Sequence, residues 1–173
     1  DHALEQNKIK HGDFVNKNLR RSNPFECHSI DNNKDWIEVS KSNNPSMKNV
    51  TLHHCPCNVT TFNERICTLY DDFPNICPDL IYLDAPDQFS PIGNVRGIST
   101  NHPDRLPMSA DILTFEHFLL PGTLIVVDGR TANARFLKAN LQRNWDYHHS
   151  EEYDQHFFEL KEKPLGVYNQ RQI

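Results

Sequence analysis

The stretches "DLIYLDAP", residues 79–86, and "LLPGTLIVVDGR", residues 119–130, decide the predicted fold. Each contains a continuous apolar run that ends on an aspartate, Asp84 in the first and Asp128 in the second. Continuous rather than alternating apolar runs of this length are typical of strands buried on both faces of a parallel sheet. Both stretches are therefore predicted to be core strands that bring a carboxylate to one edge of a sheet.

Two earlier apolar runs, "FECHSID" at 25–31 and "NVTLHHCPC" at 49–57, are predicted to be strands as well. The segments between and after the strands have helical spacing of their apolar residues, and they cover 35–43, 59–73, 109–120 and 131–145. Alternation of short strands with helices predicts a right-handed, mostly parallel α/β sheet flanked by helices.

The two ends of the chain differ from this alternation. Residues 1–24 predict a polar helical lead-in without a convincing strand, so the first strand of the pattern is missing. Near the other end, short strands are predicted at 147–149 and 156–160. Because their acidic link is too short for a crossover helix, they are expected to pair antiparallel, which gives a reversed C-terminal edge strand. Residues 163–173 are expected to form a tail of this single domain, which spans 1–173.

Composition limits the classes of partner. A chain of 173 residues can build one domain with a hydrophobic core. Its formal net charge of −5 argues against binding to nucleic acid or to a membrane surface. No apolar run approaches the roughly 18 residues that a spanning helix needs. Five cysteines, an odd number in a chain of this size, predict reduced thiols and a cytoplasmic protein.

Three of the four predicted strands end in a carboxylate, Asp31, Asp84 or Asp128. Ligands of open α/β sheets bind beyond the carboxyl ends of the strands. One such acid can simply terminate a strand, but three at the same edge predict a binding crevice.

The order of these elements, the acid after the "HSI" strand and the phrase "LLPGTLIVVDGR" resemble class I S-adenosylmethionine-dependent methyltransferases. The nearest members are the small-molecule O-methyltransferases, and the resemblance covers about residues 25–162. It implies a Rossmann-like, seven-stranded sheet with a reversed last strand. It also implies S-adenosylmethionine as the cofactor, and methyl transfer to a hydroxyl of a small molecule or sugar as the enzymatic reaction.

The resemblance also implies roles for individual residues. Asp31, with Asn33 beside it, would hold the ribose of the cofactor, and Cys57 and Asn58 would edge its adenine. Asp84 would lie near the transferred methyl group, where it would bind the cofactor and take part in catalysis. In metal-dependent members, the acids at the positions that match Asp84 and Asp128 bind a divalent cation. Mg²⁺ is therefore a further candidate cofactor.

This chain departs from the family pattern in two ways. Metal-dependent members have Asn after the fifth-strand acid, whereas Gly129 follows it here, and hard cations prefer several oxygen ligands. The Gly-rich turn that cradles the methionine part of the cofactor is also missing from the sequence. Either the sequence lacks residues ahead of residue 1, or the protein is a degenerate relative that does not bind the cofactor.

The segment around His102 and the stretch "HHCPC" each have two competing interpretations. His102 lies in the long segment 93–111, and an imidazole with a near-neutral pKa suits a general base for O-methylation; the alternative is a solvated loop histidine. Arg96 and Arg105 in the same segment could pair with an anionic substrate. "HHCPC" at 53–57 suggests zinc, but its spacing differs from Cys-x2–4-Cys, which favours buried strand-end cysteines.

Two alternatives to the methyltransferase remain open at this point. One is a non-catalytic methyltransferase-like binding domain. The other is a nucleotide- or NAD-binding Rossmann domain, which the missing glycine fingerprint disfavours. The sequence leaves open whether the protein forms a homo-oligomer.

Overall fold

The computed structural model describes residues 1–22, 24–84 and 86–172. Its helical segments are α1 (His2–Asn18), α2 (Lys34–Asn43), α3 (Asp111–Phe115), the 3-10 turn η1 (Glu116–Phe118), α4 (Thr131–Asn140) and α5 (Gly166–Gln170). Its strands are β1 (Cys27–Asp31), β2 (Val50–His54), β3 (Cys57–Phe62), β4 (Arg65–Tyr70), β5 (Leu80–Leu83), β6 (Leu124–Asp128), β7 (Trp145–Ser150) and β8 (Gln155–Leu160).

The described strands form three sheets, so the expected single, mostly parallel Rossmann-like sheet is wrong. β1 and β2 form a parallel pair, β3 and β4 an antiparallel pair, and the third sheet has the order β5-β6-β8-β7. In this sheet β5 and β6 are parallel, and β8 runs antiparallel to both of its neighbours. Parallel pairing is thus confined to β1–β2 and β5–β6, and among the described residues no ladder of hydrogen bonds joins β1 to β5.

The predicted helix over 59–73 is also wrong, because this segment is the β3–β4 hairpin. Its start, "VTT" at 59–61, consists of β-branched residues that favour strands. Asn63 and Glu64 both have positive φ, 48° and 63°, and they reverse the chain between the paired residues Phe62 and Arg65. A two-residue turn with positive φ at both positions matches the twist of a hairpin. The crossover helix expected here is therefore replaced by local antiparallel pairing.

The end of the chain confirms the antiparallel pair but not the reversed edge strand, because the reversed strand β8 lies between β6 and β7 and the edge strand β7 runs in the direction of β6. β7 and β8 pair antiparallel over their full length, as the short acidic link predicted. α1 forms within the helical lead-in, and the tail contains the short helix α5. The helix expected over 109–120 is shorter, because α3 gives way to η1. The helix expected over 131–145 ends at Asn140, since Leu141 is already extended and Trp145 begins β7.

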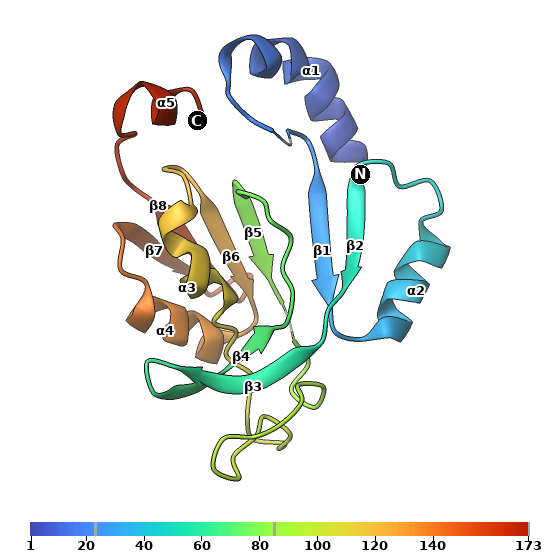
Figure 1. Ribbon diagram of the computed structural model, residues 1–173, viewed down its shortest axis with the longest axis vertical. Helices are drawn as coiled ribbons and strands as arrows, with labels where there is room; N and C mark the ends of the chain where they lie inside the picture. The colour runs from blue at the N-terminus through green and yellow to red at the C-terminus, as the bar shows by residue number, and fades with distance from the viewer. Residues whose placement is uncertain (23, 85, 173) are drawn as a thin grey trace.

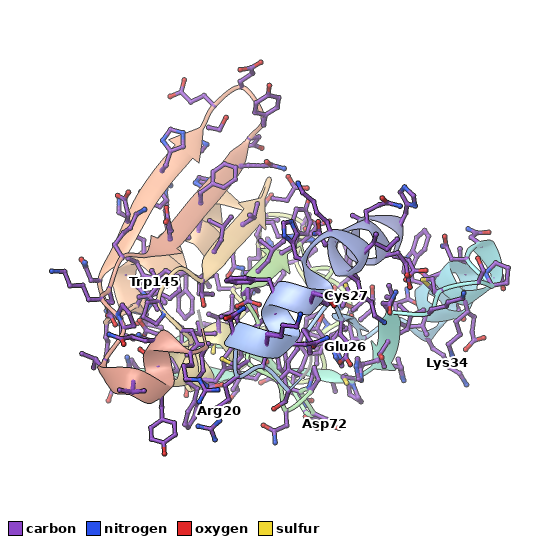
Figure 2. The ribbon with its side chains drawn as sticks, turned by 90° about the horizontal axis from the view of Figure 1, so that it is seen from above. Arg20, Glu26, Cys27, Lys34, Asp72 and Trp145 are labelled. Carbon is purple, nitrogen blue, oxygen red and sulfur yellow. The ribbon has the colours of Figure 1, made fainter. Side chains whose placement is uncertain are left out.

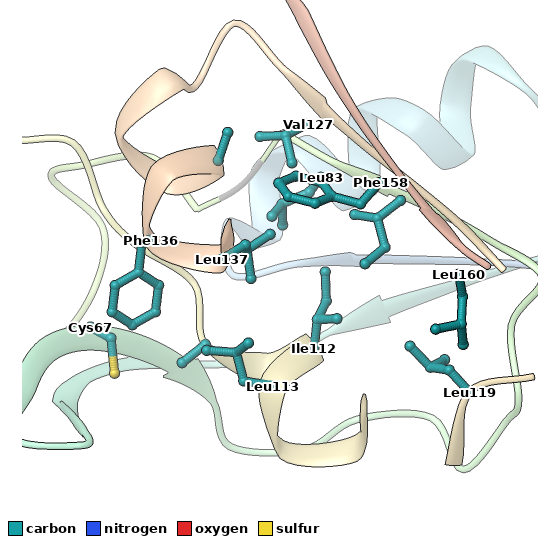
Figure 3. Close-up of a cluster of buried hydrophobic side chains, with 13 residues drawn as sticks. Cys67, Leu83, Ile112, Leu113, Leu119, Val127, Phe136, Leu137, Phe158 and Leu160 are labelled. Carbon is teal, nitrogen blue, oxygen red and sulfur yellow. The ribbon is translucent and has the colours of Figure 1, made fainter. Parts of the chain in front are cut away.

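The hydrophobic core lies between the four-stranded sheet and the elements α3, α4 and β4. Figure 3 shows this cluster, which includes the side chains of Phe158, Val127 and Leu137. Its remaining buried members are Cys67, Leu83, Ala110, Ile112, Leu113, Leu119, Ile125, Ala134, Phe136 and Leu160. All of them lie between residues 67 and 160, so α1, β1 and β2 add nothing to this cluster.

Figure 1 shows how the elements set up a common edge. β1, β2, β5 and β6 run in the same direction, and the long segment after β5 lies below their ends. A hydrogen bond of 2.9 Å from Asn32 Nδ2 to Ser90 Oγ joins the residue after β1 to this segment. The ends of these four strands therefore lie on the same side of the molecule although the strands belong to different sheets. Within the described residues, no helix is long and apolar enough to cross a membrane.

Candidate functional site

A pocket of about 410 Å³ lies at the carboxyl ends of β5 and β6. Four of the described residues that line it are aspartates, namely Asp84, Asp87, Asp128 and Asp154. Its other described lining residues are Gln88, Leu106, Gly129 and Arg130. Four carboxylates facing one guanidinium give the pocket a negative potential, which favours a cationic or hydroxyl-bearing ligand over an anionic one.

The parallel pairing of β5 with β6 brings the first two aspartates together. Leu83 pairs with Val127, and each is followed at once by an acid of the pocket, Asp84 or Asp128. Gly129, with φ of 59°, then turns the chain from β6 toward α4. Its N–H donates to the carbonyl of Asp154 at 2.8 Å, which fastens the β7–β8 turn to the wall of the pocket.

Arg130 pairs with Asp84 inside the pocket. Its Nε lies 3.2 Å from Asp84 Oδ1, and its Nη1 donates to the carbonyl of Pro86 at 2.9 Å. The guanidinium is largely buried, with 19% of the side chain exposed, whereas the Asp84 side chain is 62% exposed. Arg130 is therefore a fixed positive charge that holds the start of the long segment against α4, and Asp84 is only partly free for a ligand.

Asp128 is held by two neutral donors. It accepts a hydrogen bond from the Tyr82 hydroxyl and another, of 3.2 Å, from Gln155 Nε2. These bonds hold the pKa of the Asp128 carboxyl below its usual value, with the Tyr82 bond contributing most. The same bond raises the pKa of Tyr82 to about 12. Asp128 is therefore an anion and Tyr82 a neutral phenol at neutral pH.

Asp31 and Asn33, the predicted ribose residues, are outside the described lining of this pocket. Asp31 Oδ1 accepts from the backbone N–H of Asn33 at 2.7 Å. The Asn33 side chain in turn caps α2, accepting from the backbone N–H groups of Asp35 and Trp36. Asn33 therefore has a structural role that accounts for it, since Asn is a preferred helix N-cap.

Cys57 and Asn58, the predicted adenine residues, lie just past the parallel strand β2, where they begin β3. Cys57 is 1% exposed, and burial raises the pKa of its thiol to about 12. The Asn58 amide donates to Asp71 Oδ1. The structure thus buries the first of these side chains, ties the second to a neighbouring strand end, and places neither in the described lining of the pocket.

His102, the predicted base, is outside the described lining of the pocket and is linked to it through its backbone. Its carbonyl accepts from the pocket residue Gln88 at 3.1 Å, while its Nδ1 accepts from the N–H of Asp104 at 3.2 Å. A neutral imidazole that accepts at Nδ1 carries its proton on Nε2. In this arrangement the ring has no free basic nitrogen to offer a substrate hydroxyl. Arg105, from the same segment, donates to the carbonyl of Ser99.

Sequence reasoning missed two parts of this region. Arg130 follows directly after the strand-end "DG", but nothing in the sequence predicts its partner across the pocket. The second part is a group of metal-ligand side chains, His149, Asp154 and His156, whose ligand atoms all lie within 4.8 Å of one another. The predicted metal residues Asp84 and Asp128 do not belong to this group, which among the described residues is the one cluster of three or more. The antiparallel pairing predicted for 147–149 and 156–160 was the available signal for it.

No protein-family model, no curated protein and no solved structure matches this chain.

Proposed function

We propose that this protein transfers the methyl group of S-adenosylmethionine to a hydroxyl of a small molecule or sugar, with the reacting groups held in the pocket at the ends of β5 and β6. The observation that carries the proposal is the convergence of Asp84 and Asp128 with two further aspartates in that pocket. Two of these four carboxylates come from the strand ends at which the sequence predicted them.

The charge of the pocket suits this chemistry. S-adenosylmethionine carries a sulfonium cation, which a pocket with four carboxylates and one guanidinium attracts. Carboxylates are also strong acceptors for the hydroxyl groups of a sugar-like acceptor. Asp128, kept anionic by Tyr82 and Gln155, can orient such a hydroxyl by accepting its hydrogen bond. Methyl transfer is an in-line displacement, so most of the rate gain comes from holding the two partners in position.

The residues present fit part of the cofactor. The Oδ2 atom of Asp31 makes no hydrogen bond within the described residues, so it can accept from a ribose hydroxyl. For the methionyl carboxylate, the described pocket offers Arg130, which is already paired with Asp84. A magnesium ion between Asp84 and Asp128 would compete with Arg130 for the Asp84 carboxylate, so the proposal assigns the positive charge beside Asp84 to this guanidinium.

Calorimetric titration with S-adenosylmethionine and S-adenosylhomocysteine tests the proposal, because these ligands differ in the sulfonium charge. We expect the charged ligand to bind more tightly, and Asp84→Asn and Asp128→Asn to reduce that preference by roughly threefold to tenfold each. Asp146→Asn is the matched control, since Asp146 is exposed near the opposite end of β7. Absence of binding by either ligand, or equal losses in all three variants, would overturn the proposal.

The Arg130–Asp84 ion pair favours a second candidate, a binding domain that holds a hydroxylated ligand without reacting with it. A carboxylate neutralised by a fixed guanidinium is better suited to binding a ligand hydroxyl than to taking part in a reaction. Incubation with methyl-labelled S-adenosylmethionine and a panel of polyols, sugars and phenols separates the two. Transfer of label that Asp84→Asn reduces supports the enzyme, whereas ligand binding without transfer supports the binding domain.

A further inference from the structure

We propose that His149, Asp154 and His156 form a binding site for a divalent transition-metal ion of the zinc class. Each residue offers one ligand atom, and these atoms lie within 4.8 Å of one another. The proposal concerns metal binding alone, and it holds whether or not the neighbouring pocket carries out methyl transfer.

The β7–β8 hairpin builds the site. Figure 2 shows this hairpin projecting from the body of the molecule, with Trp145 at its base. Antiparallel pairing sets His149 directly opposite His156 near the turn. Asp154, with φ of 49°, closes that turn, and its carbonyl is held by the N–H of Gly129. All three ligands are thus positioned by one hairpin that is anchored to the end of β6.

His149 supplies the observation that points to a ligand. Its Nε2 is buried and has no hydrogen-bond partner among the described residues. The nearest acid oxygen in the group, Asp154 Oδ1, lies 3.9 Å away, beyond hydrogen-bond distance. Buried polar atoms in folded proteins nearly always have a partner, so an orphaned imidazole nitrogen beside a carboxylate calls for an explanation. A metal ion between the two atoms satisfies both.

His156 supplies a rigid second imidazole. It is 1% exposed, its Nδ1 lies 2.9 Å from the Tyr147 hydroxyl, and its Nε2 lies 3.2 Å from Thr131 Oγ1. Hydroxyl groups can rotate, so one nitrogen can exchange its partner for the ion while the other keeps its own. A metal-bound histidine whose second nitrogen is hydrogen-bonded is the usual arrangement, because that bond orients the ring.

Metal binding requires a small movement of His149. The two imidazole rings are stacked, with centroids 4.1 Å apart and planes 8° from parallel, so their nitrogens do not yet point at one centre. A tetrahedral ion with bonds of about 2.0–2.1 Å needs ligand atoms about 3.3 Å apart. His149 is half-buried, with 34% of its side chain exposed, and has room to turn toward Asp154 and His156.

The ligand set selects the class of ion. Two imidazole nitrogens and one carboxylate oxygen suit Zn²⁺, Co²⁺ or Ni²⁺, whereas Mg²⁺ and Ca²⁺ prefer oxygen ligands throughout. Three protein ligands leave a coordination position for water or a substrate atom. Because Asp154 also lines the acidic pocket, the bound ion would add positive charge at the pocket wall.

Titration of the protein with Co²⁺, followed by visible absorption, and with Zn²⁺, followed by calorimetry, tests the proposal. We expect one equivalent of ion, d–d bands of a nitrogen- and oxygen-ligated Co²⁺, and at least a tenfold loss of affinity in His149→Gln. Asp154→Asn, in which the altered side chain is 66% exposed, should show a similar loss without a threat to folding. His148→Gln is the matched control, since the adjacent His148 is exposed on the other face of β7.

Other metal-binding groups have distinguishable signatures. Cys27 and Cys77 are exposed free thiols, and a cobalt ion on a thiolate gives intense near-ultraviolet charge-transfer bands. The proposal is overturned if Co²⁺ binding gives the thiolate charge-transfer bands without the d–d bands of a nitrogen- and oxygen-ligated ion. It is also overturned if His149→Gln binds the ion as tightly as the unchanged protein, or if no stoichiometric binding occurs. A rise in melting temperature on adding Zn²⁺, present with His148→Gln and lost with His149→Gln, is the independent second measurement.

Discussion

At the scale of the residue, Asp128 shows how neutral neighbours set the state of a pocket carboxylate. Its two donors, Tyr82 and Gln155, come from the strands on either side of β6. Both bonds favour the charged form, and so the folded protein holds this proton less tightly than the unfolded chain does. The carboxylate contributes stability above its unfolded pKa, and this contribution is lost as the pH falls through the lower folded pKa.

Tyr82→Phe should raise the pKa of Asp128 toward its ordinary value of 3.8, because the largest cause of the lowering is the Tyr82 hydrogen bond. Carbon-13 NMR titration of the aspartate carboxyl groups measures the change. Tyr153→Phe serves as control, since Tyr153 is 66% exposed in the β7–β8 turn. An unchanged Asp128 titration in Tyr82→Phe would contradict this account of the pocket.

Gly129→Ala should destabilise the fold by about 1 kcal/mol, because φ is 59° at this position and a Cβ is disfavoured there. Space is a smaller concern, since the added Cβ would lie 3.6 Å from Asp154 Oδ2, an ordinary contact. Urea unfolding gives the difference in free energy. Gly12→Ala, within α1, is the opposite case and should stabilise by up to about 1 kcal/mol through helix propensity. Equal effects of the two substitutions would refute the conformational argument.

At the scale of the element, Glu116 joins η1 to the connection between α4 and β7. It is 3% exposed, and its carboxylate accepts from the backbone N–H groups of Gln142 and Arg143 and from Trp145 Nε1 at 2.8 Å. The guanidinium of Arg143 donates to the carbonyls of Glu116 and Leu119 in the same junction. One buried acid thereby fixes where α4 stops and where β7 begins.

Glu116→Ala should therefore lower the free energy of unfolding by about 3 kcal/mol, because it leaves buried backbone and indole donors without an acceptor. Thermal or urea unfolding monitored by circular dichroism measures the loss. Glu151→Ala, in the exposed turn of the β7–β8 hairpin, should change stability by less than about 0.5 kcal/mol. A loss for Glu116→Ala no larger than that of the control would show that the buried bonds do not matter.

The elements also show where local pattern was sufficient for prediction. β5 and β6 were predictable because continuous apolar runs with terminal acids have few other interpretations, and the β7–β8 pair because its link is short. The segment 59–73 was misread because Phe62, Ile66 and Leu69 fit helical spacing as well as they fit two short strands. The decision lay in Asn63 and Glu64, whose positive φ values appear only once the hairpin forms.

At the scale of the whole molecule, burial is distributed unevenly. Among the described residues from 1 to 54, Ile37 is the one buried side chain, whereas the hydrophobic cluster lies entirely within 67–160. Ile9 and Phe14 of α1 are 77% and 60% exposed. Local opening costs little free energy where few apolar contacts are broken. The part containing α1, β1, α2 and β2 should therefore open more readily than the four-stranded sheet.

Hydrogen–deuterium exchange measured by mass spectrometry should show this difference directly. We expect amides of β1 and β2 to exchange at least about tenfold faster than those of β6 and β8, although both regions are hydrogen-bonded strands. β6 is the internal reference, because Ile125 and Val127 are fully buried. Equal protection of the two regions would show that they unfold as one cooperative unit.

The sequence by itself determined the apolar strands β1, β2, β5 and β6, the carboxylates at the ends of β5 and β6, and the antiparallel pair at the end of the chain. These features depend on the spacing of neighbouring residues, which local physical chemistry specifies. The tertiary structure alone decided that β1 and β5 belong to different sheets, that Arg130 pairs with Asp84, and that Asp154 joins His149 and His156. Those outcomes depend on contacts between residues far apart in the chain, or on the geometry of one turn. Hydrogen bonding and burial settle such contacts only when the whole fold is in place.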